Sequence, residues 1–566
     1  MDLEEYKKFN LPPTSIILNG LMSVFFVSGL DFTEGIGSDF EHAVTHTGFG
    51  KFHRTLLFIC GLIYANTALG ITILCFVLPS AQCDFQMTSQ DKGLLTAAPM
   101  LGMVIGSYFW GCLADTRGRK VVLVATLLMD GICGLASSIS QYFTVFLVLR
   151  FFSGFALTGT MGIVFPYLGE FQSTKYREKL LCWMELFWTV GIIALPGTPV
   201  LAQGYHPHPL LLMSTVIAWL VIPLDINYET EYFVFRSWNL FVALCSLPSI
   251  FLGVWLCIFP ESPKYLIEGE MFDEALNVFR EMYSLNTGNP PDEYPVKYLK
   301  EKVRNMSIAS VQSVTSVKSI KTIKTRRDFK ILFNEIWWQT KALCKPPHLK
   351  YTVLTCLIQF GLTTSYYTLM IWFPELFYRF EEFDMAHPNQ TASVCEVSSV
   401  FVNATTGVEE QFCGDPLDDS VFLHTLIIGL ACIPTSVWLP LGVHRLGAKF
   451  FLVFSLLVSG AVTMGLYFVQ TATQNLILSC IFEAFTSMGI STVYCMVVDL
   501  FPTNLRVMAA ALSLTFGRGG ALLGNLIFGF LIDMNCIVPI ALFSAMLFLS
   551  GVLGLTLPST GVSDLE

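Results

Sequence analysis

Charged side chains are scarce in this sequence. Only 13% of the 566 residues are Asp, Glu, Lys or Arg, whereas a soluble globular protein carries about 25%. In their place 53% of the residues are hydrophobic, and the mean hydropathy is +0.60. This composition is typical of a protein embedded in a lipid bilayer. The formal net charge of −10, with basic residues mostly in loops, excludes nucleic acid as an expected partner.

The signatures of catalysis are lacking as well. The sequence contains no phosphate-binding loop, no nucleophile elbow and no ATP-binding domain. Its 16 cysteines are mostly single residues inside apolar segments, where we interpret them as small packing residues rather than metal ligands. We therefore expect neither an enzyme nor a bound cofactor or metal.

Long apolar segments make up most of the chain. Each is about 20 residues long and could cross a bilayer as a helix, and a soluble core rarely contains so many with so few charges. Together they predict an all-α, multi-pass membrane protein with twelve transmembrane helices. The segments cover residues 55–78, 93–113, 121–139, 144–168, 181–202, 237–259, 351–376, 421–443, 450–469, 475–498, 507–532 and 536–557.

A polar stretch divides these segments into two groups of six. Within it, residues 272–283 have the pattern of an amphipathic helix. The predicted organisation is an N-terminal leader at 1–54, a six-helix bundle at 55–259, a central loop at 260–350, a second six-helix bundle at 351–557 and a tail at 558–566.

The distribution of basic residues predicts the orientation. The central loop is rich in Lys and Arg, whereas the loop 377–420 has Arg379 as its single basic residue, beside many acids. Because basic loops stay in the cytoplasm, the central loop and both termini are predicted to be cytoplasmic. The loop 377–420 is then lumenal or extracellular, in a vesicle or plasma membrane. Acidic residues near the start of the chain argue against a cleavable signal peptide.

The loop 377–420 carries further signs of an oxidising compartment. Asn389 and Asn403 stand in glycosylation sequons. Cys395 and Cys413 lie in the same loop and could form a disulfide there. We expect glycans at the two asparagines, and Cys395 and Cys413 are candidates for a disulfide.

Acid–base pairs recur near the predicted cytoplasmic ends of the helices. Glu170 and Arg177 are seven residues apart after the fourth segment, and Asp499 and Arg506 are seven apart after the tenth. This repetition indicates two related halves, and we interpret the charges as a conformational latch, although ordinary loop charges are the alternative. The predicted latch residues are Gly111, Asp115, Gly118, Arg119, Lys120, Arg150, Glu170, Arg177, Glu261, Asp499 and Arg506.

Several motifs resemble those of the major facilitator superfamily. Residues 111–120 (GCLADTRGRK) resemble the loop between its second and third helices, and residues 260–264 (PESPK) resemble a motif of its organic-ion and sugar transporters. Residues 150–154 and 365–374 add to this resemblance. Together the motifs make the chain similar to the synaptic vesicle glycoprotein 2 group, including invertebrate members. The resemblance implies two six-helix pseudo-repeats that rock about a central site.

The sequence departs from that pattern at two places. The first segment has no acidic residue at 64–70, where the resembled proteins tend to carry one, so proton coupling through that helix is not expected. About twenty extra residues stand at 197–216. They are either a true insertion or an error in the gene assembly.

The resemblance places a substrate near the middle of the membrane, between the halves. Ionisable side chains are costly there and are site candidates by default, and aromatic faces beside a carboxylate suit an organic cation. Two alternatives remain open: Glu483 could lie near the outer end and be solvated, and Arg150 and Asp130 could be structural. The predicted substrate-binding residues are Asn66, Trp183, Glu185, Trp188, Tyr366, Tyr367, Glu483, Tyr494 and Arg518.

Two functions are consistent with these patterns. The first is a monomeric secondary transporter of a small organic solute, such as an organic ion, that works by alternating access and is driven by a coupling ion or by the solute gradient. The alternative is a transport-inactive vesicle glycoprotein that serves as a binding or trafficking component. The lack of acids at 64–70 favours the alternative, and the repeated latch motifs favour the transporter.

Overall fold

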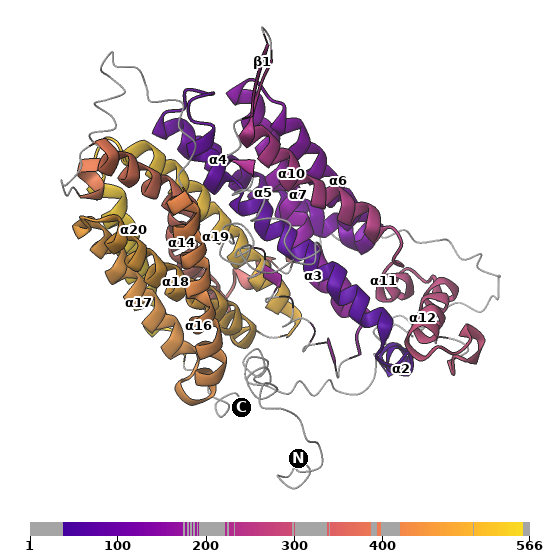
Figure 1. The fold of residues 1–566 in the computed structure, drawn as a ribbon. Coiled ribbons are helices and arrows are strands. Elements are labelled where there is room, and N and C mark those ends of the chain that lie inside the picture. The colour runs from indigo at the N-terminus through magenta and orange to yellow at the C-terminus, as the bar shows by residue number, and fades with distance from the viewer. Residues whose placement is uncertain are drawn as a thin grey trace, which may run out of the picture.

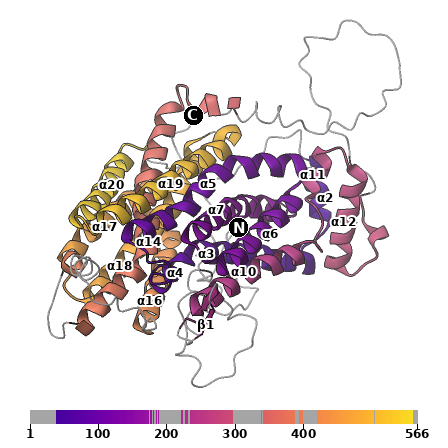
Figure 2. The same cartoon turned by 90° about the horizontal axis from the view of Figure 1, so that it is seen from above.

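The computed structural model describes residues 38–173, 226–296, 337–386, 393–397 and 419–558, apart from 231–232, 339 and 502. It also describes single residues between 176 and 222 and at 299. Within these residues the protein is almost entirely helical. The helices form two bundles that lie side by side, the first in indigo to magenta and the second in orange to yellow (Figure 1, Figure 2).

In the N-terminal half each described membrane crossing is a single helix, except the first crossing, which consists of two consecutive helices. A short helix, α2 (Ser38–His46), precedes it. The membrane helices are α3 (Lys51–Thr72) with α4 (Leu74–Ser80), α5 (Ser89–Arg117), α6 (Arg119–Ser138), α7 (Phe143–Glu170) and α10 (Ser237–Leu256).

The C-terminal half repeats this order. Its helices are α14 (Leu349–Ala386), α16 (Asp419–Leu446), α17 (Ala448–Gly465) with the 3₁₀ turn η3 (Leu466–Phe468), α18 (Ala472–Leu500), α19 (Thr503–Leu531) and α20 (Ile537–Leu555). Helices α5 of the first half and α19 of the second make the broadest contact between the two halves.

The helices follow the apolar segments of the sequence. Nine helices in the described part of the chain are long and apolar enough to cross a membrane, and α14 and α16 stand at the seventh and eighth predicted segments. The all-helical fold is therefore confirmed. The fifth segment, 181–202, and the extra residues 197–216 fall largely or wholly outside the described residues.

The boundaries of the first half differ from the prediction at one place. Helix α3 begins at Lys51, inside the predicted leader 1–54. Its first turn is held by Asn286, whose side-chain oxygen accepts from the backbone N–H of Phe52 at 3.1 Å. This contact comes from far along the chain, so hydropathy alone could not reveal it.

The start of the central loop is docked on the first half. It folds as α11 (Pro263–Glu268), α12 (Phe272–Thr287) and the turn η2 (Pro291–Glu293). The predicted amphipathic helix is thus confirmed, and it ends at Gly288 in the left-handed conformation, φ +82°. Tyr294 is fully buried and donates to the backbone oxygen of Ala43 in α2 at 2.6 Å. We call the face with the α5–α6 turn and α11–α12 the basic face.

The opposite face carries the α4–α5 and α19–α20 turns, and we call it the acidic face. A hairpin of β1 (Asn227–Thr230) and β2 (Phe233–Arg236) extends from it (Figure 1). The strands pair antiparallel, with Asn227 opposite Arg236. Arg236 forms an ion pair of 2.9 Å with Asp84 in the α4–α5 turn. The sequence did not predict this hairpin.

Glycines allow α5 and α7 to approach closely. A Cβ atom on Gly102 would lie 2.2 Å from the backbone oxygen of Phe151, and one on Gly154 would lie 2.2 Å from that of Pro99. Small residues at such positions let membrane helices pack backbone to backbone. A side chain at Gly102 can be accommodated only if the two helices move apart.

We expect Gly102→Val to lower the thermal stability of the purified protein. The clash is with backbone atoms, and overpacking of this kind costs about 1–3 kcal/mol. Gly111→Val is the matched control, because Gly111 lies on the same helix with nothing within 4 Å of its Cβ position. Unfolding followed by tryptophan fluorescence in detergent compares the two. Equal melting temperatures for both variants would contradict the close packing described above.

Candidate functional site

The basic face of the N-terminal half carries an ion-pair cluster. Arg119, at the start of α6, contacts Glu170 at the end of α7, with 2.8 Å between Nε and Oε2. The same guanidinium lies 3.4 Å from a carboxylate oxygen of Asp115. Glu170 also accepts a hydrogen bond of 2.5 Å from the hydroxyl of Ser262. These predicted latch residues are brought together, and the contacts join elements of one half.

Glu261 shapes the turn between α5 and α6. Its carboxylate accepts from the backbone N–H of Lys120 at 2.9 Å. Gly118 precedes Lys120 with φ +104°, and a Cβ atom there would lie 2.5 Å from Glu261 Oε2. The turn therefore requires glycine both for its backbone angle and for the approach of the carboxylate.

Two further latch residues are placed differently from the prediction. Arg177 contacts Glu41 of α2 at 2.6 Å, and not the Glu170 that precedes it in sequence. Arg150 lies near the acidic-face end of α7, where it donates to Ser137 of α6 and lies over the ring of Phe146. These contacts tie two helices together at the opposite face, which supports the structural interpretation of Arg150; its role in a latch stays a prediction. Asp499 and Arg506 lie on α18 and α19, but their side chains lie outside the described residues.

Asn66 belongs to a polar network inside the N-terminal half. Its amide donates to Ser249 Oγ of α10 at 2.8 Å, and Ser249 donates to Asp130 of α6 at 2.7 Å. Ser153 of α7 donates to the other oxygen of Asp130 at 2.6 Å. This chain links four helices through groups that are all buried. It supports the structural interpretation of Asp130 that the sequence left open.

Glu483 lies in the middle of α18, against α14. The residue is 3% exposed, so the alternative of a solvated position near the helix end is wrong. Its carboxyl group shares a hydrogen bond with the hydroxyl of Tyr366. The rings of Tyr366 and Tyr367 meet edge to face, 5.0 Å apart. Three predicted binding residues are thus gathered at one place.

Arg518 of α19 reaches across into the N-terminal half. Its guanidinium donates to Ser107 Oγ of α5 at 2.7 Å and to Thr158 Oγ1 of α7. All three residues lie near the middle of their helices, so the contact crosses the centre of the molecule. Tyr367 is close enough to feel the charge of Arg518. The arginine therefore borders the cluster of Glu483 while bonding to the opposite half.

The other predicted site residues are less informative. Trp188 packs against Tyr64, with ring centroids 4.9 Å apart, and is partly buried. Trp183 and Glu185 lie outside the described residues, as do Asn389, Asn403 and Cys413, and so does the side chain of Tyr494. Their assignments stay predictions.

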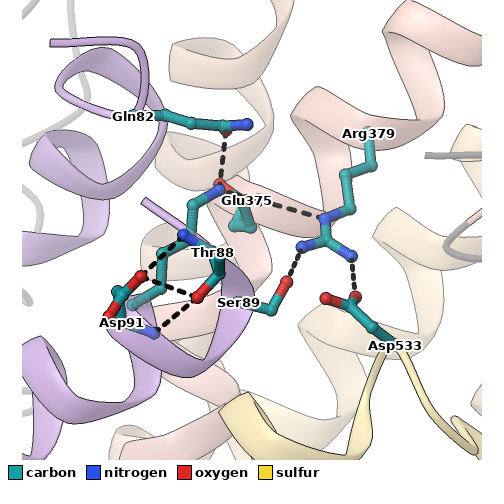
Figure 3. A network of polar contacts seen from close by, with 8 residues as sticks. Gln82, Thr88, Ser89, Asp91, Glu375, Arg379 and Asp533 are labelled. Carbon is teal, nitrogen blue, oxygen red and sulfur yellow. Dashed lines mark hydrogen bonds and ion pairs between the residues drawn. The ribbon is translucent and has the colours of Figure 1, made fainter. Parts of the chain in front are cut away.

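A second buried ionic cluster joins the halves near the acidic face. Lys92 of α5 forms an ion pair with Glu375 of α14, and both side chains are nearly inaccessible, 2% and 1% exposed. Arg379, one turn further on α14, contacts Glu375 at 3.0 Å and Asp533 at 3.1 Å. Figure 3 shows Glu375, Arg379 and Asp533 converging between the helices, with Arg379 also donating to Ser89 of α5 at 2.8 Å.

Local sequence explains how α5 presents Lys92. Thr88 caps the helix: its hydroxyl accepts from the N–H of Asp91, and Asp91 accepts from the N–H of Thr88. This capping box fixes the first turn, so that Ser89 and Lys92 reach Arg379 and Glu375 of α14. Asp91 is half-buried and turns to Thr88 instead (Figure 3). Gln82, in the α4–α5 turn, accepts a further hydrogen bond of 2.8 Å from Lys92.

Sequence reasoning missed this cluster. Lys92 stands beside one apolar segment and Glu375 inside another, and ionisable groups within membrane helices are themselves a signal of function. Arg379 was read as a loop residue because the apolar segment ends at 376, although α14 continues to Ala386. The two partners are 283 residues apart, so their pairing could not be read from spacing.

The predicted disulfide is also corrected. Cys395 bonds to Cys536, with a sulfur–sulfur distance of 2.08 Å, and not to Cys413. Cys536 lies in the α19–α20 turn, close in sequence to Asp533. The bond therefore attaches the segment 393–397 to the turn that holds Arg379. Cys83 in the α4–α5 turn is disulfide-bonded as well.

Comparison with known proteins identifies relatives over nearly the whole chain. Synaptic vesicle glycoprotein 2B of Mus musculus is 25% identical over 93% of this chain and 86% of its own length. The human protein of that name is 25% identical over 94% and 87%. Synaptic vesicle glycoprotein 2C of Mus musculus is 25% identical over 93% and 81%.

Solved structures agree on the fold. The inward-open conformation of the xylose transporter XylE from E. coli matches with a TM-score of 0.60 at 14% identity, covering 90% of this chain and 98% of that one. A crystal structure of a D-xylose-proton symporter matches with a TM-score of 0.58 at 13% identity, covering 90% and 99%.

The profile of one protein family matches just under half of the chain. The family described as "Sugar (and other) transporter" matches residues 66–340, which include the α5–α6 turn and the PESPK motif. The chain thus has the fold of the major facilitator superfamily and is similar to the sugar transporter family over residues 66–340, with the synaptic vesicle glycoproteins 2 as distant relatives.

Proposed function

We propose that this protein is a secondary transporter of a small organic solute that works by alternating access. The observation that carries the proposal is the buried Lys92–Glu375 ion pair between the two halves. A pair of this kind is stable only while both partners stay in place, and removing one partner costs about 3–5 kcal/mol. It therefore suits a gate that is either fully closed, with the ion pair formed, or fully open, with the ion pair broken.

The position of the pair supports a closed gate at the acidic face. Near it, a Cβ atom on Gly93 would lie 2.8 Å from the Cα of Gly529, and Phe76 of α4 stacks on Phe422 of α16 at 5.4 Å. The ion pairs of the basic face, by contrast, join elements of the N-terminal half. In the proposed orientation the acidic face is lumenal or extracellular, and the basic face is cytoplasmic.

The proposed substrate site lies behind this gate. Tyr366, Tyr367 and Glu483 come from the C-terminal half, and Arg518 connects their surroundings to Ser107 and Thr158 of the other half. A solute at this level would contact both halves, so its binding could alter their packing. A small organic solute fits this mixture of aromatic and ionisable groups.

A second candidate is a transport-inactive binding or trafficking component of a membrane. It is favoured by the first membrane helix, where Asn66 is engaged in the structural network with Ser249 and Asp130 and no acid stands at 64–70. This candidate needs neither the opening of the gate nor a cycle. The two functions therefore differ in what they predict for a protein locked in one conformation. A transporter would lose its function, and a binding or trafficking component would keep it.

We expect Glu375→Gln to open the acidic-face end. The substitution leaves Lys92 buried without its anion, which favours separation of α5 from α14. Cys75 reports this separation, because it is 4% exposed and lies against the backbone oxygen of Met370. Labelling by an impermeant maleimide from the acidic face, followed by mass spectrometry, should become at least about tenfold faster, since 1.4 kcal/mol already gives that factor.

Asp91→Asn is the control for this experiment. Asp91 lies on the same turn of α5 as Lys92, but it is partly exposed and its side-chain hydrogen bonds are with Thr88. Its variant should label like the unmodified protein. If Glu375→Gln and Asp91→Asn label Cys75 equally slowly, the ion pair does not hold the gate.

We expect a cross-link between the halves to stop transport. Phe76→Cys and Phe422→Cys place thiols on the two stacked positions, where a short bifunctional maleimide can join them. Uptake of a panel of organic cations, anions, sugars and zwitterions into proteoliposomes identifies a substrate, and the cross-linked protein should lose that uptake. Each single cysteine variant treated with the same reagent is the control. Biological activity that persists in the cross-linked protein would instead favour the second candidate.

A further inference from the structure

Glu483, in the proposed substrate site, is a buried carboxyl group with no cationic partner among the described side chains. It lies eleven residues into the 29-residue helix α18, far from either face. One of its oxygens, Oε2, is inaccessible to solvent and has no hydrogen-bond donor among the described residues. The group to which its carboxyl bonds in this part of the chain is the hydroxyl of Tyr366.

Among the described side chains, those that interact with Glu483 are neutral, and the nearby Arg518 borders Tyr367 while it donates to Ser107 and Thr158. Tyr366 and Tyr367 face it from α14, Cys75 from α4, Cys432 from α16, and Cys480 from its own helix. No ion pair of Glu483 occurs among the described side chains, in contrast to Glu375, which has two cationic partners. A carboxylate in such surroundings would lack the compensation that a buried charge requires.

A positive charge must therefore accompany Glu483 in this closed arrangement. An organic ammonium group requires room beside the carboxyl, whereas Oε2 is fully covered by protein. A proton requires no additional volume. The geometry therefore favours the smallest cation, which converts the carboxylate to a neutral acid by forming one O–H bond.

The location of Glu483 links its proton to the gate. Cys75 of the N-terminal half lies close enough to Glu483 to feel its charge, and the same Cys75 contacts Met370 of α14. When the acidic-face end opens, α4 must leave α14, and water then reaches the region of Glu483. A hydrated carboxyl group can ionise, since water replaces the missing hydrogen-bond donors.

We propose that Glu483 is the proton-binding residue of the transport cycle, taking up one proton from the acidic-face compartment as that end of the molecule closes. This inference rests on the proposed function. The proton comes from hydronium in that compartment, and the new O–H bond forms on the carboxylate before it is buried beside Tyr366. Low pH on the acidic side thus favours the closed arrangement, and high pH favours opening.

The first test detects the proton itself. The full chain is reconstituted in lipid, and infrared difference spectra are recorded between low and high pH. We expect a carbonyl band of a protonated, buried carboxyl group that shifts in Glu483→Asp and disappears in Glu483→Gln. The control Asp91→Asn, which removes a partly exposed carboxyl group, should leave the band unchanged. A band that persists in Glu483→Gln would overturn the proposal.

The second test connects the proton to the gate through Cys75. The rate of labelling from the acidic face is divided by the rate for the detergent-unfolded protein at the same pH, because the thiolate fraction itself rises with pH. This ratio should rise with pH, by at most about tenfold per pH unit for one proton. In Glu483→Gln, which mimics the neutral acid, the ratio should stay low at every pH. A pH dependence equal to that of the unmodified protein would overturn the proposal.

The two tests separate this inference from the proposed function. If Cys75 is never labelled, even in Glu375→Gln, the proposed gate fails while the infrared band still reports on Glu483. If instead Glu483 is ionised at low pH in the spectra and tetraethylammonium slows labelling in the unmodified protein but not in Glu483→Gln, the carboxylate binds organic cations. That result would overturn the assignment of the proton and leave alternating access intact.

Discussion

The ion pair between Lys92 and Glu375 is the contact on which the arrangement of the two halves depends. Both groups are withdrawn from water, and the lysine comes from one half and the carboxylate from the other. Neither charge could remain buried alone at an acceptable free energy. Arg379, Asp533 and Ser89 surround the pair, so that the halves are joined by several directional bonds rather than by apolar contact alone. Such bonds have a defined geometry, and they are lost together when the helices separate. The contact between the halves therefore depends on their relative position more strongly than a purely apolar contact would.

Within each half the polar contacts have a different character. Asp130 accepts hydrogen bonds from Ser153 and Ser249, which ties α6 to α7 and α10. At the basic face, Arg119 and Glu170 connect α6 to α7, and Ser262 attaches the start of the central loop. These bonds hold the N-terminal half together as a unit, whatever the position of the other half. The glycines of α5 and α7 add close backbone packing. A rocking motion has two requirements. The half that moves must be stable as a unit, and its contact with the other half must be able to break.

The sequence predicted local features well and remote ones poorly. Apolar segments and the amphipathic helix of the central loop depend on neighbouring residues, so their periodicity and length were sufficient. The pairing of Lys92 with Glu375 joins residues 283 positions apart, and no spacing rule reaches that far. Cys395 was paired with a cysteine of its own loop, whereas its partner lies 141 residues away in the α19–α20 turn. The motif that contains Arg150 favours the latch, whereas its contact with Ser137 lies near the acidic face. For Glu483 the sequence indicates the residue type and the segment, and burial decides between the two interpretations.

The contrast between Glu375 and Glu483 explains why one membrane protein would keep two buried carboxyl groups. Glu375 is surrounded by Lys92 and Arg379, so it remains ionised and serves as a fixed charge. Glu483 meets a tyrosine hydroxyl and thiols, so its charge can persist only where water reaches it. A fixed charge can hold a gate, but it cannot report on the solution outside. A variable charge can do so, because its protonation depends on pH and on hydration. Opening the acidic-face end would change the surroundings of both groups at once: it breaks the bonds of the first and hydrates the second. The free energy of one event is thereby coupled to the other through the same movement of α4 and α5 against α14.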